Sequence, residues 1–261
     1  MTPTFGKSRR GFTRVELLPV VSAVVLIIVS AFFMQRHFGP TGKRIRCTGQ
    51  LKQIGLGFCL WMSDHRERPP WRRTVKDGGH LDSQTSPLRG ELWFQFAWIS
   101  NELGSPKILV DPADKDPNIR AAKTWDAKGG LADPQFRDRA CSYVLALDFE
   151  TSANGLIPIE LVQNGVLVTD RHLLSESKGE ECSLSKMKAT AFLKPFRLNW
   201  ADQIHGPSGG NVGLIDGRVD FMSPSRVAAI LPVNSEWPYS DNPSSSAHLL
   251  FPRRTNSADV R

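Results

Sequence analysis

The sequence predicts an α+β fold in which an N-terminal transmembrane helix has a kinked, amphipathic continuation packed on a small antiparallel sheet. An uncharged apolar run, 17–34, is long enough for a membrane helix. A helical repeat of apolar residues follows within 43–68. Farther along, short runs rich in β-forming residues alternate with turn residues, as in an α+β domain.

Length and composition allow one substantial domain or two small ones, because the chain has 261 residues and 40% apolar content. The net charge is +7, but the basic residues form no stripe interleaved with aromatic residues. Arg72-Arg73 and Arg253-Arg254 are isolated pairs. We therefore expect no nucleic-acid partner.

The apolar run from Leu17 to Met34 would extend about 27 Å as a helix, close to the thickness of a bilayer core. A buried core helix and a cleaved signal peptide are the alternatives. The residues that follow the run offer a poor small-residue cleavage site, which favours a retained span at 12–38. Basic residues flank the run on both sides, so charge alone does not set its orientation.

A distinctive pattern precedes this run. Residues 1–11 form a short basic leader that ends Arg9-Arg10-Gly11, and Phe12 and Glu16 follow. An acidic residue in an apolar helix costs up to roughly 2.5–3.5 kcal/mol at the bilayer centre, so Glu16 is expected to have a role. The plainer alternative is an interfacial carboxylate favoured by the helix N-terminus.

This pattern resembles the type IV prepilin signature, although Arg14 and Pro19 depart from it. The resemblance implies a pilin-like protein that prepilin peptidase cleaves between Gly11 and Phe12, with methylation of Phe12. It also implies that Glu16 neutralises the N-terminal amine of an adjacent subunit during assembly. The leader would be cytoplasmic, giving a single-pass protein of the bacterial inner membrane with its C-terminal domain outside the cytoplasm.

Beyond the span, Gly39-Pro40-Thr41-Gly42 predicts a break or kink in the helix. An amphipathic helix is predicted over 43–68, because apolar residues recur at helical spacing until Pro69-Pro70. We expect that stripe to pack on the following domain; it comprises Leu51, Ile54, Phe58, Trp61 and Met62.

Two further segments strengthen the resemblance. Residues 46–56, and later His205 with Asn211 and Asp216-Gly217, resemble bacterial pseudopilin-like proteins that carry a prepilin leader and a C-terminal H-X9-DG signature. Ten residues separate His205 from Asp216 here, one more than that signature has.

The Asp216-Gly217 pair lies between two short apolar runs, which predicts a hairpin with a two-residue type I′ turn. That register pairs Val212 with Phe221 and places four residues on one buried face: Val212, Leu214, Val219 and Phe221. Asp216 and Gly217 are then mainly turn-forming residues. His205 is interpreted as a hydrogen-bonding strut, with a ligand or a catalytic base as the alternatives.

Cysteine spacing predicts no metal bound through sulfur, because the chain has no CxxC and no Cys/His pair at zinc-ligand spacing. Cys47 and Cys59 would lie about 18 Å apart on one helix. Within one molecule, only Cys141 and Cys182 are therefore plausible disulfide partners. The acidic loop 111–118 has oxygen ligands of the kind that calcium prefers but lacks the EF-hand pattern, and we expect no metal and no cofactor.

An extracytoplasmic α+β domain is predicted over 69–233. Its turn-forming stretches delimit short strands at 142–147, 155–161 and 165–169. The segment 234–261 is polar and rich in Ser, Pro and Asn, which predicts a disordered tail.

The chain contains no GxSxG, HExxH, Walker A or dinucleotide fingerprint, so no enzyme activity is predicted. The preferred hypothesis is a non-enzymatic subunit of a type IV pilus or a type II-like secretion pseudopilus. Its partners would be prepilin peptidase, other pilin-like subunits and the membrane. The alternative is a membrane-anchored extracytoplasmic binding or hydrolytic domain that uses His205 and nearby Asp residues.

Overall fold

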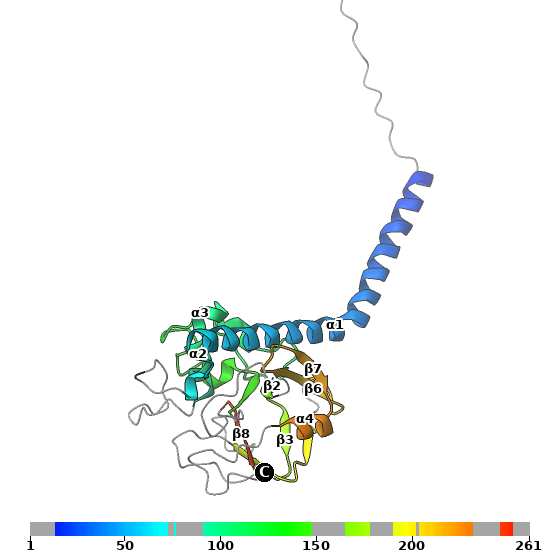
Figure 1. Cartoon of the computed structure of the whole chain (residues 1–261). Helices are drawn as coiled ribbons and strands as arrows, with labels where there is room; N and C mark the ends of the chain where they lie inside the picture. Colours follow the sequence, from blue (N-terminus) through cyan, green and yellow to red (C-terminus); the bar gives the residue numbers. More distant parts are fainter. Residues whose placement is uncertain are drawn as a thin grey trace, which may run out of the picture. The chain divides into compact units, whose positions relative to one another are not determined.

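The computed structural model describes residues 14–72, 76, 91–147, 165–177, 190–201, 204–231 and 246–252. The chain divides into two compact units, Met1–Gly42 and Lys43–Arg261. The first helix, α1 (Arg14–Asp64), begins in the first unit and ends in the second (Figure 1).

The helix α1 is continuous in its secondary structure across 39–42, so of the predicted break or kink, the break is wrong. A single Gly costs about 1 kcal/mol in a helix interior and Pro about 3 kcal/mol. Helix propagation on both sides of such residues can outweigh these local costs, because the hydrogen-bonded turns that flank them are already formed.

Among the residues that the structure describes, no helix combines the length and the apolar character that crossing a membrane requires. The prediction of a transmembrane helix at 12–38 is therefore wrong. The predicted placement as a single-pass protein of the inner membrane, with a cytoplasmic N-terminus and an extracytoplasmic domain, is wrong for the same reason.

A six-stranded sheet forms the centre of the second unit, and every neighbouring pair in it is antiparallel. Its order is β4-β8-β1-β2-β6-β7. The strands are β1 (Tyr143–Ala146), β2 (Val166–Asp170), β4 (Thr190–Leu193), β6 (Gly210–Leu214), β7 (Val219–Met222) and β8 (Ser246–Leu250). The combination of helix and antiparallel sheet agrees with the predicted class, and the strands predicted at 142–147 and 165–169 correspond to β1 and β2.

Strand β8 lies within the segment 234–261, which composition predicts to be disordered, and the prediction is wrong for these residues. Ala247, Leu249 and Leu250 are buried, and β8 pairs with both β1 and β4. A short apolar run is enough to form a strand when two neighbouring strands satisfy its backbone hydrogen bonds. The strand predicted at 155–161 lies outside the described residues.

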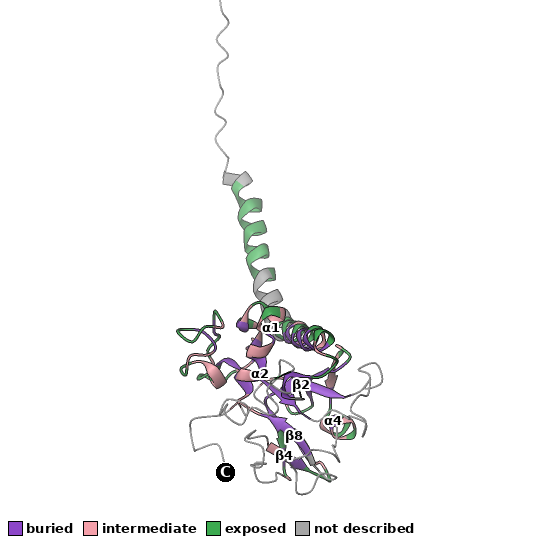
Figure 2. Cartoon of the chain, turned by 60° about the vertical axis from the view of Figure 1, so that its left-hand side comes forward, coloured by how far each residue is buried: buried purple, intermediate pink, exposed green. Residues whose placement is uncertain are grey.

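The two faces of the sheet carry separate cores, and strands β2 and β8 are coloured as buried in Figure 2. One face is covered by residues 43–64 of α1 and by α2 (Leu92–Trp98), and the predicted helical stripe is buried there, which confirms that prediction. Further short helices adjoin this core: η1 (Pro70–Arg72), α3 (Ser100–Leu103), η4 (Pro106–Leu109) and η5 (Arg137–Ala140). The other face packs on a two-stranded sheet, β3 (Leu173–Ser175) with β5 (Leu198–Trp200), and on α4 (Pro224–Ile230).

The hairpin register differs from the predicted one by a single residue. Val212 pairs with Asp220, and Asn211 pairs with Phe221. The connection is a three-residue loop, 215–217, closed by a hydrogen bond from Leu214 N to Arg218 O, and Gly217 has a φ of 82° there. Because side chains alternate along a strand, the shift places Val219 and Phe221 on the face opposite Val212 and Leu214.

Replacing Phe58 tests whether α1 anchors the second unit. Its ring is fully buried, with an edge-on contact to Trp71 at 5.5 Å between centroids. We expect Phe58→Ala to lower the free energy of unfolding by about 3–5 kcal/mol, as measured by denaturant titration of tryptophan fluorescence. Leu56→Ala is the control, because Leu56 is exposed on the same helix; equal effects of the two substitutions would contradict this packing.

Candidate functional site

The helix α1 runs along β6, and this alignment positions the site. Four residues at intervals of four meet the strand or its loop: Cys47, Leu51, Gly55 and Cys59. At one end, Nδ2 of Asn211 donates to Sγ of Cys47 at 3.2 Å; at the other, Sγ of Cys59 donates to the carbonyl of Ile215 at 3.2 Å. A side chain at Gly55 would bring its Cβ to 3.9 Å from Gly217 Cα, which is ordinary contact.

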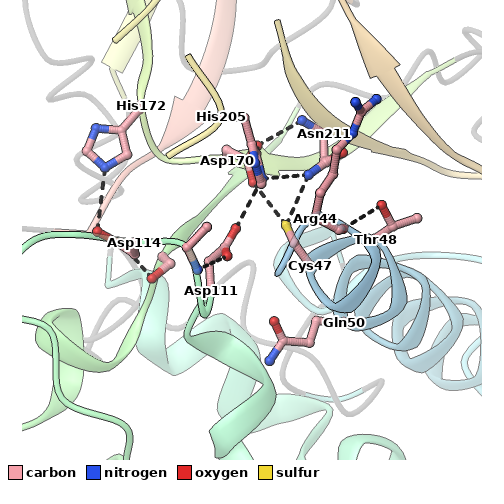
Figure 3. Close-up of polar contacts among 12 residues, drawn as sticks. Arg44, Cys47, Thr48, Gln50, Asp111, Asp114, Asp170, His172, His205 and Asn211 are labelled. Atoms are coloured by element: carbon pink, nitrogen blue, oxygen red, sulfur yellow. Dashed lines mark hydrogen bonds and ion pairs between the residues drawn. The ribbon is translucent and has the colours of Figure 1, made fainter. Parts of the chain in front are cut away.

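At the Cys47 end, four metal-ligating side chains from separate parts of the chain converge (Figure 3). Cys47 comes from α1, Asp170 ends β2, and Asp111 and His205 belong to loops. One donor atom of each lies within 4.8 Å of the others. Nε2 of His205 is 3.5 Å from Oδ2 of Asp111 and 3.7 Å from Oδ2 of Asp170, and Sγ of Cys47 is 3.6 Å from Oδ1 of Asp170.

The cluster is buried, with side-chain exposure of 7% for His205, 2% for Asp170 and none for Asp111. Burial and the nearby charge of Asp111 raise the pKa of Asp170 to about 7, against the opposing effect of His205. Burial and both carboxylates also raise the pKa of Cys47. For His205, burial lowers the pKa, but the two carboxylates outweigh it and raise the pKa overall.

Hydrogen bonds hold the carboxylates in place. The backbone N–H of Asn211 donates to Oδ2 of Asp170 at 2.8 Å, and the N–H of Ala113 donates to Oδ1 of Asp111 at 2.7 Å. Oδ2 of Asp111, however, is buried and accepts no hydrogen bond. The side chain of Asn211 also meets Nε2 of His205 at 2.7 Å.

Two further polar side chains border the cluster. The hydroxyl of Tyr143 donates to Oε1 of Gln50 at 3.0 Å, and Nε2 of Gln50 donates to the carbonyl of Val110 at 3.1 Å. This chain of bonds ties α1 to β1 and to the residue before Asp111. The same hydroxyl also lies 3.7 Å from Sγ of Cys47, so Tyr143 joins this chain of bonds to the cluster.

A second buried cluster adjoins the first. Arg171 contacts both oxygens of Asp114 at 2.9 Å and Asp116 at 2.9 Å, and Ser142 donates to Asp114 at 2.7 Å. Burial acts to raise the pKa of Asp114, but the His172 ring, whose Nε2 lies 3.8 Å from Oδ1, the charge of Arg171 and the hydrogen bond from Ser142 hold it well below its usual value. The guanidinium of Arg171 thus neutralises two carboxylates, Asp114 and Asp116, of the acidic loop in which the sequence offers oxygen ligands of the kind that calcium prefers.

The structure places the predicted site residues at separate points. Gly11 and Phe12 lie outside the described residues; Glu16 is in the first turn of α1, and its side chain is outside them. His205 and Asn211 meet in the buried cluster. Asp216 and Gly217 form the β6–β7 loop, where Asp216 accepts from the backbone N–H of Arg218 at 3.0 Å. The two halves of the H-X9-DG-like signature therefore lie at opposite ends of β6.

Sequence reasoning missed three members of the cluster: Cys47, Asp111 and Asp170. Cys47 lies four residues before Leu51, in the same helical row, and Asp170 ends an apolar strand. Those patterns place the residues near a core but give no reason to associate them. Sequence spacing left Cys141 and Cys182 as the plausible disulfide partners. Cys141 is a buried free thiol in the structure, and Cys182 lies outside the described residues.

No protein-family model matches the chain, and neither a curated protein nor a solved structure matches it significantly.

Removing Arg171 tests the second cluster. Arg171→Met leaves the carboxylates of Asp114 and Asp116 without their cation, so we expect a loss of about 3–5 kcal/mol in unfolding free energy at neutral pH. Because the folded pKa of Asp114 is depressed, its stabilisation is present above about pH 4 and is lost as pH falls below that. The difference between wild type and variant should accordingly shrink in acid.

The matched control is Arg197→Met, which removes an exposed partner of Glu176 at 3.8 Å and should cost less than about 1 kcal/mol. Chemical denaturation at several pH values measures both variants. A loss for Arg171→Met no larger than that for Arg197→Met would contradict the structural role of the ion pair.

Proposed function

We propose that this chain is a non-enzymatic, pilin-like subunit, cleaved between Gly11 and Phe12 by a prepilin peptidase and assembled into a type IV pilus or a type II-like pseudopilus. The observation that carries the proposal is an exposed apolar helical surface directly after the prepilin-like motif. In the first unit, all the described side chains of α1, residues 17–30, are exposed.

The character of this surface supports assembly through helix packing. Leu18, Leu26 and Ile27 are each 66–70% exposed, and only two polar side chains interrupt the stretch. The hydroxyls of Ser22 and Ser30 donate to carbonyls of their own helix, at 3.0 and 2.9 Å, and so need no outside partner. A helix that is apolar on all sides is normally buried, and the equivalent helices of neighbouring subunits would bury it.

The alternative, a binding or hydrolytic domain built on His205 and nearby Asp residues, finds a partial counterpart in the buried cluster. His205 does lie beside Asp111 and Asp170. Their burial disfavours hydrolysis, however, because a catalytic base has to reach its substrate directly or through one water. The geometry therefore suits a structural role better than a catalytic one.

Processing is the first test. In cells with an active prepilin peptidase, we expect the mature protein to begin at Phe12, because Gly11 ends the basic leader. Intact-mass measurement of the purified protein decides this, and Gly11→Val should retain residues 1–11. A mature protein that keeps its first eleven residues, or normal processing of Gly11→Val, would sink the proposal.

Assembly through Glu16 is the second test. Cleavage would leave a cationic amine on Phe12, and an opposite charge within about 4–6 Å stabilises both charged forms, so a neighbour's Glu16 can pair with it. We expect Glu16→Ala to be cleaved like wild type but to fail in assembly, as measured by mass and by recovery of sheared surface fibres.

Asp64→Ala is the control for this experiment, since it removes an exposed carboxylate from the other end of the same helix. It should assemble normally. Wild-type assembly of Glu16→Ala would mean that the carboxylate is dispensable. Failure of Glu16→Asp as well would indicate that reach matters in addition to charge.

A further inference from the structure

We propose that Cys47, Asp111, Asp170 and His205 form a closed binding site for one divalent transition-metal ion, with zinc the best fit. This inference goes beyond the proposed function and does not depend on it.

The spacing of the donor atoms suits a four-coordinate ion. With zinc bonds of about 2.0–2.3 Å, neighbouring ligands of a tetrahedron lie about 3.3–3.8 Å apart. Three contacts in the cluster fall in this range: 3.5 Å from His205 Nε2 to Asp111 Oδ2, 3.7 Å from His205 Nε2 to Asp170 Oδ2, and 3.6 Å from Cys47 Sγ to the other oxygen of Asp170, Oδ1. One donor atom of each residue lies within 4.8 Å of all the others. Small side-chain movements are enough to enclose an ion.

The donor types select the class of metal. A thiol and an imidazole favour zinc and other transition metals, whereas magnesium and calcium prefer sites made only of oxygen ligands. Four protein donors, three of them on buried residues and the fourth on the half-buried His205, fill a tetrahedral ion without leaving a position for substrate or water. That is the arrangement of a structural zinc site rather than a catalytic one.

An unsatisfied atom points to the same conclusion. Oδ2 of Asp111 accepts no hydrogen bond although its side chain has no exposure to solvent. A buried carboxylate oxygen that lacks a hydrogen bond is costly, and a metal ion between it and Nε2 of His205, 3.5 Å away, would satisfy it. The opposite oxygen is already held by the N–H of Ala113, which leaves Oδ2 as the atom that faces the other donors (Figure 3).

Charge balance favours a dication. With Cys47 as a thiolate and His205 neutral, the site carries three negative charges, of which zinc would neutralise two. Metal binding replaces the S–H bond of Cys47 with an S–metal bond, and the proton leaves to solvent. Nε2 of His205 must give up its contact with the Asn211 amide, while the bond from that amide to Cys47 Sγ can remain.

Such an ion would join four segments distant in sequence. Cys47 lies on α1 and Asp170 at the end of β2. Asp111 comes from a loop before β2 in the sequence, and His205 comes from a loop after it. The expected result of metal binding is therefore a rise in the melting temperature of the second unit, reversed by a chelator.

Cobalt substitution of the full chain tests the proposal. After chelator treatment, Co²⁺ is added and the absorption spectrum recorded, with metal content determined by mass spectrometry. We expect about one ion per chain, tetrahedral visible bands, and a thiolate-to-cobalt charge-transfer band in the near ultraviolet. Asp111→Asn and His205→Ala should each weaken Co²⁺ binding by at least about tenfold.

Cys47→Ser should abolish the charge-transfer band, and Cys59→Ser is its matched control on the same helix, since Cys59 meets only the Ile215 end of β6. Circular dichroism checks that each variant folds. The proposal is overturned if wild type binds no cobalt or zinc, if its cobalt spectrum lacks the thiolate band, or if Cys59→Ser rather than Cys47→Ser removes that band. For a variant that does not fold, the wild-type spectrum and stoichiometry still decide.

Discussion

The packing of α1 along β6 is the contact on which the rest of the second unit depends. One helical row, Cys47 to Cys59, extends about 18 Å, and a strand of five residues extends about 17 Å, so helix and strand match over the whole length of β6. This match buries the apolar stripe of α1 over the sheet. It also fixes both ends at once, with Cys47 against Asn211 and Cys59 against Ile215.

Polar groups in such an interface need internal partners, because water does not reach them. The two buried clusters meet this requirement in different ways. Around Asp114, the guanidinium of Arg171 and a serine hydroxyl supply the charge and hydrogen bonds that the carboxylate needs. Around Asp111, two carboxylates and a thiol face a single imidazole, and one oxygen is left without a hydrogen bond. The second arrangement is the less complete, and this is the observation behind the proposed metal site.

The two units differ in how far their apolar residues are buried. The second unit covers its apolar residues with its own helices and sheets on both faces. The described part of α1 in the first unit exposes a continuous apolar surface, with its two serine hydroxyls already bonded within the helix. A chain built in this way has one unit that folds around its own core and another whose surface is suited to association, as the pilin-like proposal requires.

Periodicity and local chemistry are enough to predict the buried stripe 51–62 of the helix, strands β1 and β2, and the combination of helix with antiparallel sheet. The proposed cleavage between Gly11 and Phe12 and the proposed role of Glu16 in assembly rest on the sequence alone. The hairpin register depends on the folded chain, because a three-residue loop moves Val219 and Phe221 to the other face of the sheet. The place of β8 depends on it too, because the partners of β8 are strands distant in the sequence. Tertiary structure also decided the cluster of Cys47, Asp111, Asp170 and His205, since residues so far apart in the chain meet only when α1 lies on the sheet, and no local pattern records that contact.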